Sequence, residues 1–354
     1  MIKQEIIDRI ISDVPIQDVA KDEGINFVKE KGNRSWATCP FHNEKTPSFY
    51  VDTGMNVWRC FGQCRSGGNV ISLYRKLKNG LPFPIACKEL AKKYLNEDID
   101  DEYKPSREDE ERQKEQEALR IALDYAQSYF VEEMHNVNPG ANKAREVVRK
   151  RWGADAIDEF GIGYAPADGF ISWAMKKQLD LDLLEQVGLI GMGERGKFAM
   201  LRDRYTIPIY DKMSRVIGFT ARTLSDNSDI CKYLNLKNSP VYHKDTSVFG
   251  INFAQKEARL KDKFYLVEGA PDVVKLQSIG ILNTVASLGG SWTENQLKQL
   301  YRVSRKVTFI PDADTLKPGN EFPAGTANVF ANGRAALQVG FTVNVREIPV
   351  DYPA

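Results

Sequence analysis

The chain has 354 residues, of which 42% are hydrophobic and 27% charged. This composition is typical of folded proteins and excludes a fibrous or largely disordered chain, and the length predicts two or three domains. The formal net charge of only +1 excludes overall basicity as an argument for nucleic-acid binding, so a basic surface must be local. Charges at Lys3, Glu5, Asp8 and Arg9 exclude a signal peptide or an apolar span at the start.

The first hundred residues predict a small domain, residues 1–98. Apolar residues at helical spacing over residues 6–20 indicate two short helices, the second opened by Pro15. Aromatic and β-branched residues over 36–58 predict a small sheet, with a hairpin turn at residues 52–54. Helical periodicity returns over residues 69–95, and these helices are expected to pack beside the sheet.

A charged segment, EDIDDEYKPSREDEERQKEQEALR, follows at residues 97–120 and has almost no apolar residue. Such a segment buries too little surface to offset the entropy lost on ordering, which predicts a linker over residues 99–118. For its second half, an exposed helix start with paired opposite charges explains the composition equally well.

The rest of the chain predicts two further domains. A helical pattern over 122–150 and short strand-like runs (FGIGYAP, YTIPIYD, VIGFTART, KYLN) predict a mixed α+β domain, residues 119–260. From residue 262 strands alternate with helices, which predicts an α/β domain with a parallel sheet, residues 261–354. The predicted fold class is therefore α+β and multidomain.

Three of the five cysteines and a histidine form a cluster with metal-ligand spacing. Cys39 and His42 are separated by two residues, and Cys60 and Cys64 by three. Four such ligands favour tetrahedral Zn²⁺ in a closed, structural site, as in a zinc ribbon. The alternative is a set of buried thiols and a hydrogen-bonded histidine. A cysteine cluster of this kind suits a reducing compartment, which predicts a cytoplasmic protein.

The two remaining cysteines, Cys87 and Cys231, stand alone and are expected to be small core residues. Aromatic and basic side chains surround the predicted zinc site. Such a mixture is able to bind single-stranded nucleic acid, although a small ribbon needs most of its aromatic residues as core. These residues are Trp36, Phe41, Phe49, Tyr50, Trp58, Phe61, Arg34, Lys45, Arg59 and Arg65.

Acidic residues follow two strands of the predicted parallel sheet. Glu268 and Asp272 lie in LVEGAPD, and Asp312 and Asp314 in FIPDAD. The carboxyl ends of parallel strands meet in one crevice, and oxygen-only ligands select Mg²⁺ or Mn²⁺. A cation held there is able to catalyse phosphoryl transfer, with Glu268 as a metal ligand or general base. The alternative is that Asp272 favours the first helical turn and Asp314 lies in a turn.

Cations between these two regions form a candidate phosphate track. Taken alone they are weak evidence, because a charge run is often only a solvated face. They comprise Arg145, Arg149, Lys150, Arg151, Arg202, Arg204, Arg222, Lys232 and Lys244.

These motifs, in this order, resemble the bacterial DnaG-type DNA primases over nearly the whole chain. CPFHNEKTPSF with CFGQC is similar to their zinc-binding domain. DEFGIGYAP, LRDRYTIPIYDKMSRVIGFTART and KYLNLKNSPVYHK resemble their basic polymerase subdomain. LVEGAPDVV, VASLGG and PDAD resemble their Toprim fold.

The resemblance implies a role for each group of residues. Glu268, Asp312 and Asp314 would be the Toprim acids that hold Mg²⁺ or Mn²⁺. Nucleotide or template contacts would come from Arg151, Arg222, Lys232, Asn235 and Lys244, with Arg202 and Arg204 on the adjoining basic ridge.

Three departures from the family pattern stand out. Gln63 is an extra residue between Cys60 and Cys64, residues 315–325 form an insertion after PDAD, and a second acidic motif is missing where the chain stops at VDYPA. The missing motif implies truncation or fewer bound metals, and the departures favour a phage- or mobile-element-encoded member.

The predicted activity is that of a DNA primase, a nucleotidyltransferase that makes short RNA primers on single-stranded DNA from nucleoside triphosphates. The product would be an RNA–DNA hybrid and the setting a primosome. A replicative helicase is a candidate partner, although the family's usual helicase-binding domain is absent. Two alternatives stay open: a Toprim nuclease or topoisomerase-like enzyme, and a single-strand DNA binding module with a weak metal site.

Overall fold

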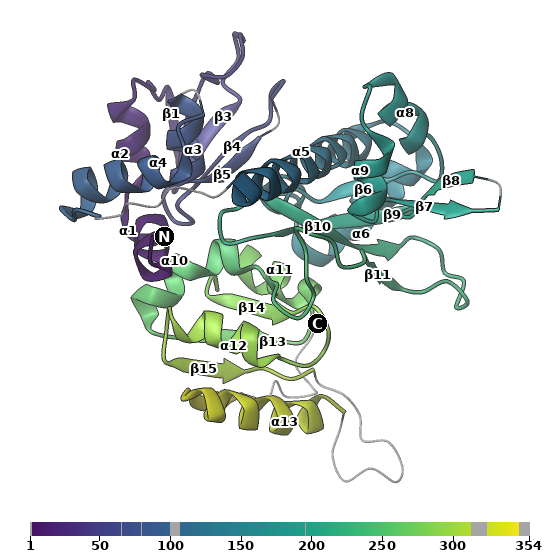
Figure 1. Ribbon diagram of the computed structural model, residues 1–354. Helices are drawn as coiled ribbons and strands as arrows, with labels where there is room; N and C mark the ends of the chain where they lie inside the picture. The colour runs from purple at the N-terminus through teal and green to yellow at the C-terminus, as the bar shows by residue number, and fades with distance from the viewer. Residues whose placement is uncertain are drawn as a thin grey trace.

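The computed structural model describes residues 2–64, 66–78, 80–99, 107–194, 196–312 and 324–346 (Figure 1). Within these residues the fold is mixed α and β, with four separate sheets. In the described ranges no helix is both long enough and apolar enough to span a bilayer.

The N-terminal module is a five-stranded antiparallel sheet in the order β1-β2-β3-β4-β5, with helices packed beside it (Figure 1). The two predicted opening helices are present, and Pro15 immediately precedes the second. Phe49, Val51 and Trp58 are buried against these helices. The elements are α1 (Gln4–Asp13), α2 (Ile16–Asp22), β1 (Lys29–Lys31), β2 (Arg34–Ala37), β3 (Phe49–Asp52), β4 (Val57–Cys60), β5 (Gly67–Asn69), α3 (Val70–Leu77), α4 (Phe83–Leu90) and the π-helical turn η1 (Ala91–Leu95).

The charged segment is helical in its second half. Helix α5 (Arg107–His135) begins inside the predicted linker, whose residues 100–106 lie outside the described part. Leu119, Leu123 and Phe130 of α5 are buried in the same cluster as Phe219 of the neighbouring sheet. The alternative of an exposed helix start is therefore correct for this half, because the helix gains its support from the apolar face that follows.

The middle module is a four-stranded antiparallel sheet in the order β11-β10-β9-β6, which contains the predicted strand runs. Two short helices and a separate hairpin between residues 170 and 199 were not predicted. The elements are α6 (Pro139–Trp152), α7 (Ala156–Phe160), β6 (Gly163–Ala165), α8 (Phe170–Lys176), α9 (Leu181–Gln186), β7 (Ile190–Gly193), β8 (Gly196–Ala199), β9 (Arg204–Tyr210), β10 (Val216–Thr223) and β11 (Tyr233–Asn235).

The last module is a five-stranded sheet in the order β12-β14-β13-β15-β16, and the predicted parallel pairing is confirmed for β13 to β16. The short edge strand β12 pairs antiparallel with β14 and was not predicted. The elements are β12 (Val248–Phe249), α10 (Ile251–Lys261), β13 (Phe264–Val267), α11 (Ala270–Ser278), β14 (Thr284–Ser287), α12 (Glu294–Tyr301), β15 (Lys306–Phe309), α13 (Ala324–Val339) and β16 (Thr342–Val345).

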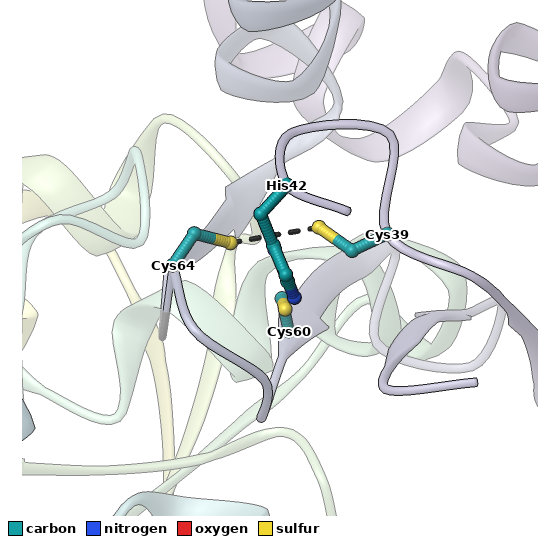
Figure 2. Close-up of side chains that lie close together, drawn as sticks. All are labelled: Cys39, His42, Cys60 and Cys64. Carbon is teal, nitrogen blue, oxygen red and sulfur yellow. Dashed lines mark hydrogen bonds between the residues drawn. The ribbon is translucent and has the colours of Figure 1, made fainter. Parts of the chain in front are cut away.

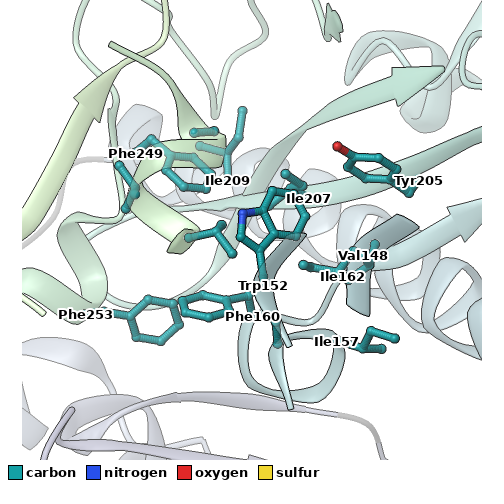
Figure 3. Close-up of a cluster of buried hydrophobic side chains, with 14 of the residues drawn as sticks. Val148, Trp152, Ile157, Phe160, Ile162, Tyr205, Ile207, Ile209, Phe249 and Phe253 are labelled. Carbon is teal, nitrogen blue, oxygen red and sulfur yellow. The ribbon is translucent and has the colours of Figure 1, made fainter. Parts of the chain in front are cut away.

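A shared apolar core joins the middle and last modules (Figure 3). Trp152, at the end of α6, packs edge-on against Tyr205 and donates its indole N–H to the carbonyl oxygen of Pro271 at 3.1 Å. Phe160 packs edge-on against Phe253 of α10. These contacts hold the four-stranded sheet of the middle module beside the edge of the parallel sheet where its strands end.

Candidate metal centres

Two turns of the N-terminal module bring the predicted zinc ligands together. Cys39 and His42 follow β2, Cys60 ends β4, and Cys64 lies in the loop before β5. The four ligand atoms lie within 4.8 Å of one another, and the Sγ atoms of Cys39 and Cys64 are 3.5 Å apart (Figure 2). Three thiols and an imidazole at this spacing fit one tetrahedral Zn²⁺ with no place for a substrate. The longer Cys60–Cys64 loop accommodates Gln63 without separating the ligands.

Neighbouring groups hold the ligands in place. The Glu44 carboxylate accepts the backbone N–H of Cys39 at 2.7 Å and lies 2.9 Å from Nε2 of His42. A hydrogen bond with the Cys60 thiol lowers the pKa of Cys64 to about 4, while the same bond and burial raise the pKa of Cys60. A Cβ at Gly62 would lie 2.5 Å from Nε2 of His42, so only glycine fits there.

The two cysteines outside the cluster differ in how exposed they are. Cys87 is buried, as predicted, but Cys231 is exposed, so its prediction as a core residue is wrong. Cys231 lies in the loop before β11, where its thiol donates to the carbonyl oxygen of Tyr233 at 2.9 Å. Lone cysteines carry no periodic signal that separates a core position from a loop.

The aromatic residues of the ribbon are mostly core, as expected. Phe49, Tyr50 and Trp58 are buried, whereas Phe61 is 37% exposed and stacks on Tyr50. Arg59 contacts the rest of the protein and donates to the hydroxyl of Tyr210 at 3.0 Å. Lys45 is exposed, and Arg65 lies outside the described residues.

A carboxylate pair lies at the carboxyl ends of two adjacent parallel strands. Glu268 follows β13 and Asp312 follows β15, and the backbone N–H of Asp312 donates to Oε1 of Glu268 at 3.3 Å. Helix α13 approaches this pair closely, because a Cβ at Gly325 would lie 2.8 Å from the same Glu268 oxygen. Asp314, the third predicted acid, lies outside the described residues.

Asp272 combines a capping role with a position beside this pair. Its Oδ2 accepts the backbone N–H of Gly269 at 3.0 Å, so the predicted stabilisation of the first turn of α11 is confirmed. Burial and the charge of Asp312 raise the pKa of Asp272 to about 6. A carboxylate whose pKa is raised by a neighbouring acid fits a divalent cation, because the cation relieves the repulsion between the two charges.

A cavity of about 490 Å³ brings the acids and several predicted basic residues together. Glu268, Asp272 and Asp312 of the last module line it together with Arg151 and Lys244. The side-chain amide of Asn235, which also lines the cavity, donates to the carbonyl oxygen of Leu288 at 3.3 Å. A Cβ at Gly289 would lie 3.0 Å from Cε of Lys244, so this glycine leaves room for the lysine. Acids and cations that line the same cavity suit a phosphate ester bound through a metal ion.

The other four predicted contact residues do not line this cavity. Arg204 is only 7% exposed, and its guanidinium points to the carbonyl oxygens of Ala221 and Lys232. Arg222 lies over the ring of Tyr233. Arg202 lies over Phe198, and Lys232 is exposed directly before β11.

Tyr233 is a cavity residue that the sequence analysis did not single out. It precedes Asn235 by two residues on β11, and alternate residues of a strand point to the same face. The strand period was therefore the signal that would have identified it.

Comparison with known families divides the chain into three matches. The CHC2 zinc finger matches residues 2–106, the N-terminal domain of the DNA primase catalytic core matches 129–255, and a Toprim-like domain matches 265–351. The matched zinc finger and the cysteine–histidine cluster indicate Zn²⁺, and the Toprim match implies a divalent metal.

Relatives and solved structures give the same result. A DNA primase of Clostridium acetobutylicum is 32% identical over 99% of this chain and 55% of its own length. The Aquifex aeolicus primase, with zinc-binding and RNA polymerase domains, has a TM-score of 0.66 at 28% identity and covers 98% of this chain and 80% of that one. A DnaG primase catalytic domain bound to single-stranded DNA has a TM-score of 0.58 at 27% identity, covering 67% and 73%.

The chain spans about half the length of the curated relatives it matches. The three family matches follow one another in the order seen in the sequence motifs, and the two metal centres lie in the first and last of them. The chain belongs to the family of bacterial DnaG-type primases.

Proposed function

We propose that this chain is a DNA primase, a nucleotidyltransferase that synthesises short RNA primers on single-stranded DNA. In this reaction the 3′-hydroxyl of one nucleoside triphosphate attacks the α-phosphorus of the next, and pyrophosphate leaves. The observation that carries the proposal is the cavity that Glu268, Asp272 and Asp312 line together with Arg151, Asn235 and Lys244. Priming serves DNA replication, which supports a cytoplasmic location.

The cations of the cavity have a binding role in this proposal. Arg151 and Lys244 neutralise phosphate oxygens of the nucleotide or the template, and the Asn235 amide orients one of them by hydrogen bonding. The indole of Trp152, fixed by its bond to Pro271, keeps the neighbouring Arg151 beside the acids. Arg202, Arg204, Arg222 and Lys232 are assigned by the family resemblance to the flanking template path, which the cavity itself does not include.

The acids of the cavity have the metal-binding role. Glu268, Asp312 and Asp314 are the proposed ligands of Mg²⁺ or Mn²⁺, with Asp272 beside them. When bound, the cation would polarise the reacting phosphate and lower the pKa of the attacking hydroxyl. Glu268 is itself held by the backbone N–H of Asp312, so its carboxylate is oriented before any ligand binds.

The zinc ribbon has a structural role and contributes to template binding. Cys39, His42, Cys60 and Cys64 would form a closed site, which leaves recognition to the surface around it. Phe61 and Lys45 are exposed there and are able to stack on a base and neutralise a phosphate. The printed description of one structural neighbour, a catalytic domain bound to single-stranded DNA, supports such a template.

The domain borders that we propose are residues 1–98, 99–118, 119–260 and 261–354. The family matches at residues 2–106, 129–255 and 265–351 support this order. Helix α5 crosses the border at residue 118, so the charged segment is a helical connection for at least its second half.

A single assay tests the activity. The chain is incubated with single-stranded DNA, labelled ribonucleotides and Mg²⁺ or Mn²⁺. Short RNA products support the proposal, and comparison of the two ions identifies the preferred one. Cleavage of the template would support the Toprim nuclease instead, and template retention without products would support a binding module; either result contradicts the proposal.

A further inference from the structure

Lys244, the lysine of the carboxylate cavity, lies in a turn rather than in a helix or strand. The turn covers residues 243–247, between β11 and β12. Two backbone N–H groups at its end donate to the carbonyl oxygen of His243 at 3.1 and 2.8 Å, and the N–H of Lys244 donates to the side chain of Asn238 at 3.0 Å. These bonds lie within one loop, so they do not fix the turn against the parallel sheet that carries the acids.

Helix α12, which packs on the parallel sheet, contacts this turn. Nε2 of Gln296 donates to the carbonyl oxygen of Lys244 at 3.0 Å and to that of Ser247 at 2.7 Å. The residues that these two bonds join are 52 and 49 positions apart in the chain. The backbone of the lysine is thereby tied to the module that provides Glu268 and Asp312.

Two further side chains complete this contact. Nε2 of Gln299 donates to the carbonyl oxygen of Thr246 at 2.6 Å. The hydroxyl of Thr293, the N-cap of α12, donates to the carbonyl oxygen of Asp245. Every carbonyl oxygen of residues 244–247 therefore accepts a hydrogen bond from α12 or its N-cap. Bonds that together engage one short segment hold it more firmly than any one of them alone.

Gln296 is the central member of this set. It is 1% exposed, and its Oε1 accepts the backbone N–H of Thr293 at 3.0 Å. The hydroxyl of Thr293 accepts the backbone N–H of Gln296 at 3.2 Å, which completes a capping box. The amide oxygen thus serves the helix cap and the amide nitrogen serves the turn. Glutamate at this position would keep the cap but lose the donor.

On the cavity side, the lysine side chain lies against a glycine. A Cβ at Gly289 would lie 3.0 Å from Cε of Lys244, and both residues line the cavity with the acids. A lysine side chain has many rotamers, so its ammonium reaches a defined place only when its backbone and its path are both fixed. Gln296 is not among the described residues that line the cavity, so its effect on a ligand there passes through the turn.

We infer that Gln296 is a positioning residue for Lys244. It holds the turn at residues 243–247 so that the lysine ammonium meets the phosphates of a nucleotide in the carboxylate cavity. A turn that is ordered beforehand loses less entropy when the nucleotide binds. The inference rests on the role proposed for Lys244 and extends it to a residue outside the cavity.

Two variants loosen the turn. Gln296→Glu keeps the side-chain size and the acceptor of the capping box, but it places a carboxylate against two carbonyl oxygens. Gln299→Met removes one bond to the same turn from a half-buried position and introduces no charge. The second variant therefore tests the contact even where the first fails to fold.

Gln277→Met is the matched control. Gln277 is 2% exposed, lies on α11 of the same module, and also donates from Nε2 to main-chain carbonyl oxygens. The acceptors are those of Gly250, Leu282 and Thr284, outside the turn. Its loss should lower the unfolding temperature without loosening Lys244.

The measurements are hydrogen exchange of the backbone amides of residues 243–249 and equilibrium binding of labelled ATP with Mg²⁺, both on the full zinc-loaded chain. We expect faster exchange in Gln296→Glu and Gln299→Met, and ATP binding about five- to tenfold weaker than in the unmodified chain. Gln277→Met should change each by less than about twofold. In primer synthesis KM should rise with Kd while kcat changes less than about threefold, since the contact to phosphate is made before and during the reaction.

Combination with Lys244→Ala separates positioning from a general loss of structure. If Gln296 acts through the lysine, Gln296→Glu should weaken ATP binding less than about twofold in a chain that already carries Lys244→Ala. Gln299→Met should behave in the same way. A merely structural role would instead give the same loss of binding with and without the lysine.

The inference is overturned if both glutamine variants bind ATP as tightly as the unmodified chain, or if they weaken binding equally with and without Lys244. Either result leaves primer synthesis by the unmodified chain intact, so the proposed function would stand. Absence of ATP binding by the unmodified chain, or unchanged binding in Lys244→Ala, would contradict the role proposed for the lysine and this inference with it. The two failures are therefore distinguishable.

Discussion

The zinc centre and the carboxylate cavity are built in different ways from the same chain. All four proposed zinc ligands come from residues 39–64, in two turns of one small sheet. The carboxylate cavity draws its lining from residues as distant as Arg151 and Asp312, on separate modules. The first centre is therefore specified by local spacing, whereas the second depends on how the modules pack. Substitutions in the two centres should therefore affect different properties: primer synthesis for the carboxylate cavity, and zinc content for the zinc centre.

The largest effect is expected from Glu268→Gln. Loss of the charge removes a proposed metal ligand while the side-chain volume stays the same, so primer synthesis should fall about 10³-fold. Initial rates on single-stranded DNA measure it. Glu294→Gln, on the exposed surface of α12 and paired with Lys298, is the control and should keep full activity. Activity of Glu268→Gln close to that of the unmodified chain would remove Glu268 from the catalytic site.

The matching change in the zinc centre is Cys60→Ala. Three remaining ligands bind zinc far more weakly, so zinc content should fall from about one ion per chain to below ~0.1 after dialysis. Metal analysis and thermal unfolding measure the two consequences. Cys231→Ala, at an exposed cysteine outside the cluster, should retain zinc. Full zinc content in Cys60→Ala would contradict the assigned ligand set.

A smaller effect, on KM, is expected when the basic residues of the carboxylate cavity are replaced. Lys244→Ala and Arg151→Ala each remove one charge-assisted contact to phosphate, which should raise the KM for nucleotide or template about 10- to 100-fold. Arg202→Ala, outside the cavity, should change it less than about threefold. Steady-state kinetics separate these cases. Equal effects at all three positions would mean that the cavity does not define the binding site.

The smallest effect is a change of stability with pH, at the junction between the zinc ribbon and the middle module. The side chain of Asp124, on α5, keeps an exposed surface, but the protein groups packed around it and the charge of Glu117 raise its pKa from 3.8 to about 7. Its ionisation is therefore disfavoured in the folded state, and stability present below pH 3.8 is lost as the pH rises toward 7. Asp124→Asn should unfold at an increasingly higher temperature than the unmodified chain as the pH rises from 5 to 8. Thermal unfolding across this range measures it, and a difference independent of pH would contradict the assigned shift.

Much of the fold could be predicted from the sequence, because long periodic segments carry their own signal. The alternation of strands and helices after residue 262 predicted the parallel sheet, and ligand spacing predicted the zinc cluster. The hairpin of β7 and β8, the helices α8 and α9, and the edge strand β12 are too short to show a clear period. Whether the second half of the charged segment was linker or helix depended on the apolar face that follows it in α5.

The candidate site could be predicted only in part. Glu268 and Asp312 follow from the rule that strand ends meet at one edge, and the structure places them within hydrogen-bonding distance. Charge alone did not distinguish the buried Arg204 from the cavity-lining Arg151, because burial is set by packing between modules. The contact between Gln296 and the turn around Lys244 has no sequence motif, since it joins residues 52 positions apart in the chain.

The most direct test of the central claim compares two reactions: primer synthesis without a primer, and extension of an RNA primer already annealed to single-stranded DNA. If the carboxylate cavity performs the chemistry and the zinc ribbon serves template binding, Glu268→Gln abolishes both reactions. Cys60→Ala, in contrast, impairs synthesis without a primer but still extends the annealed primer. Extension by Glu268→Gln at the rate of the unmodified chain, or loss of extension in a folded Cys60→Ala protein, would contradict this division of roles.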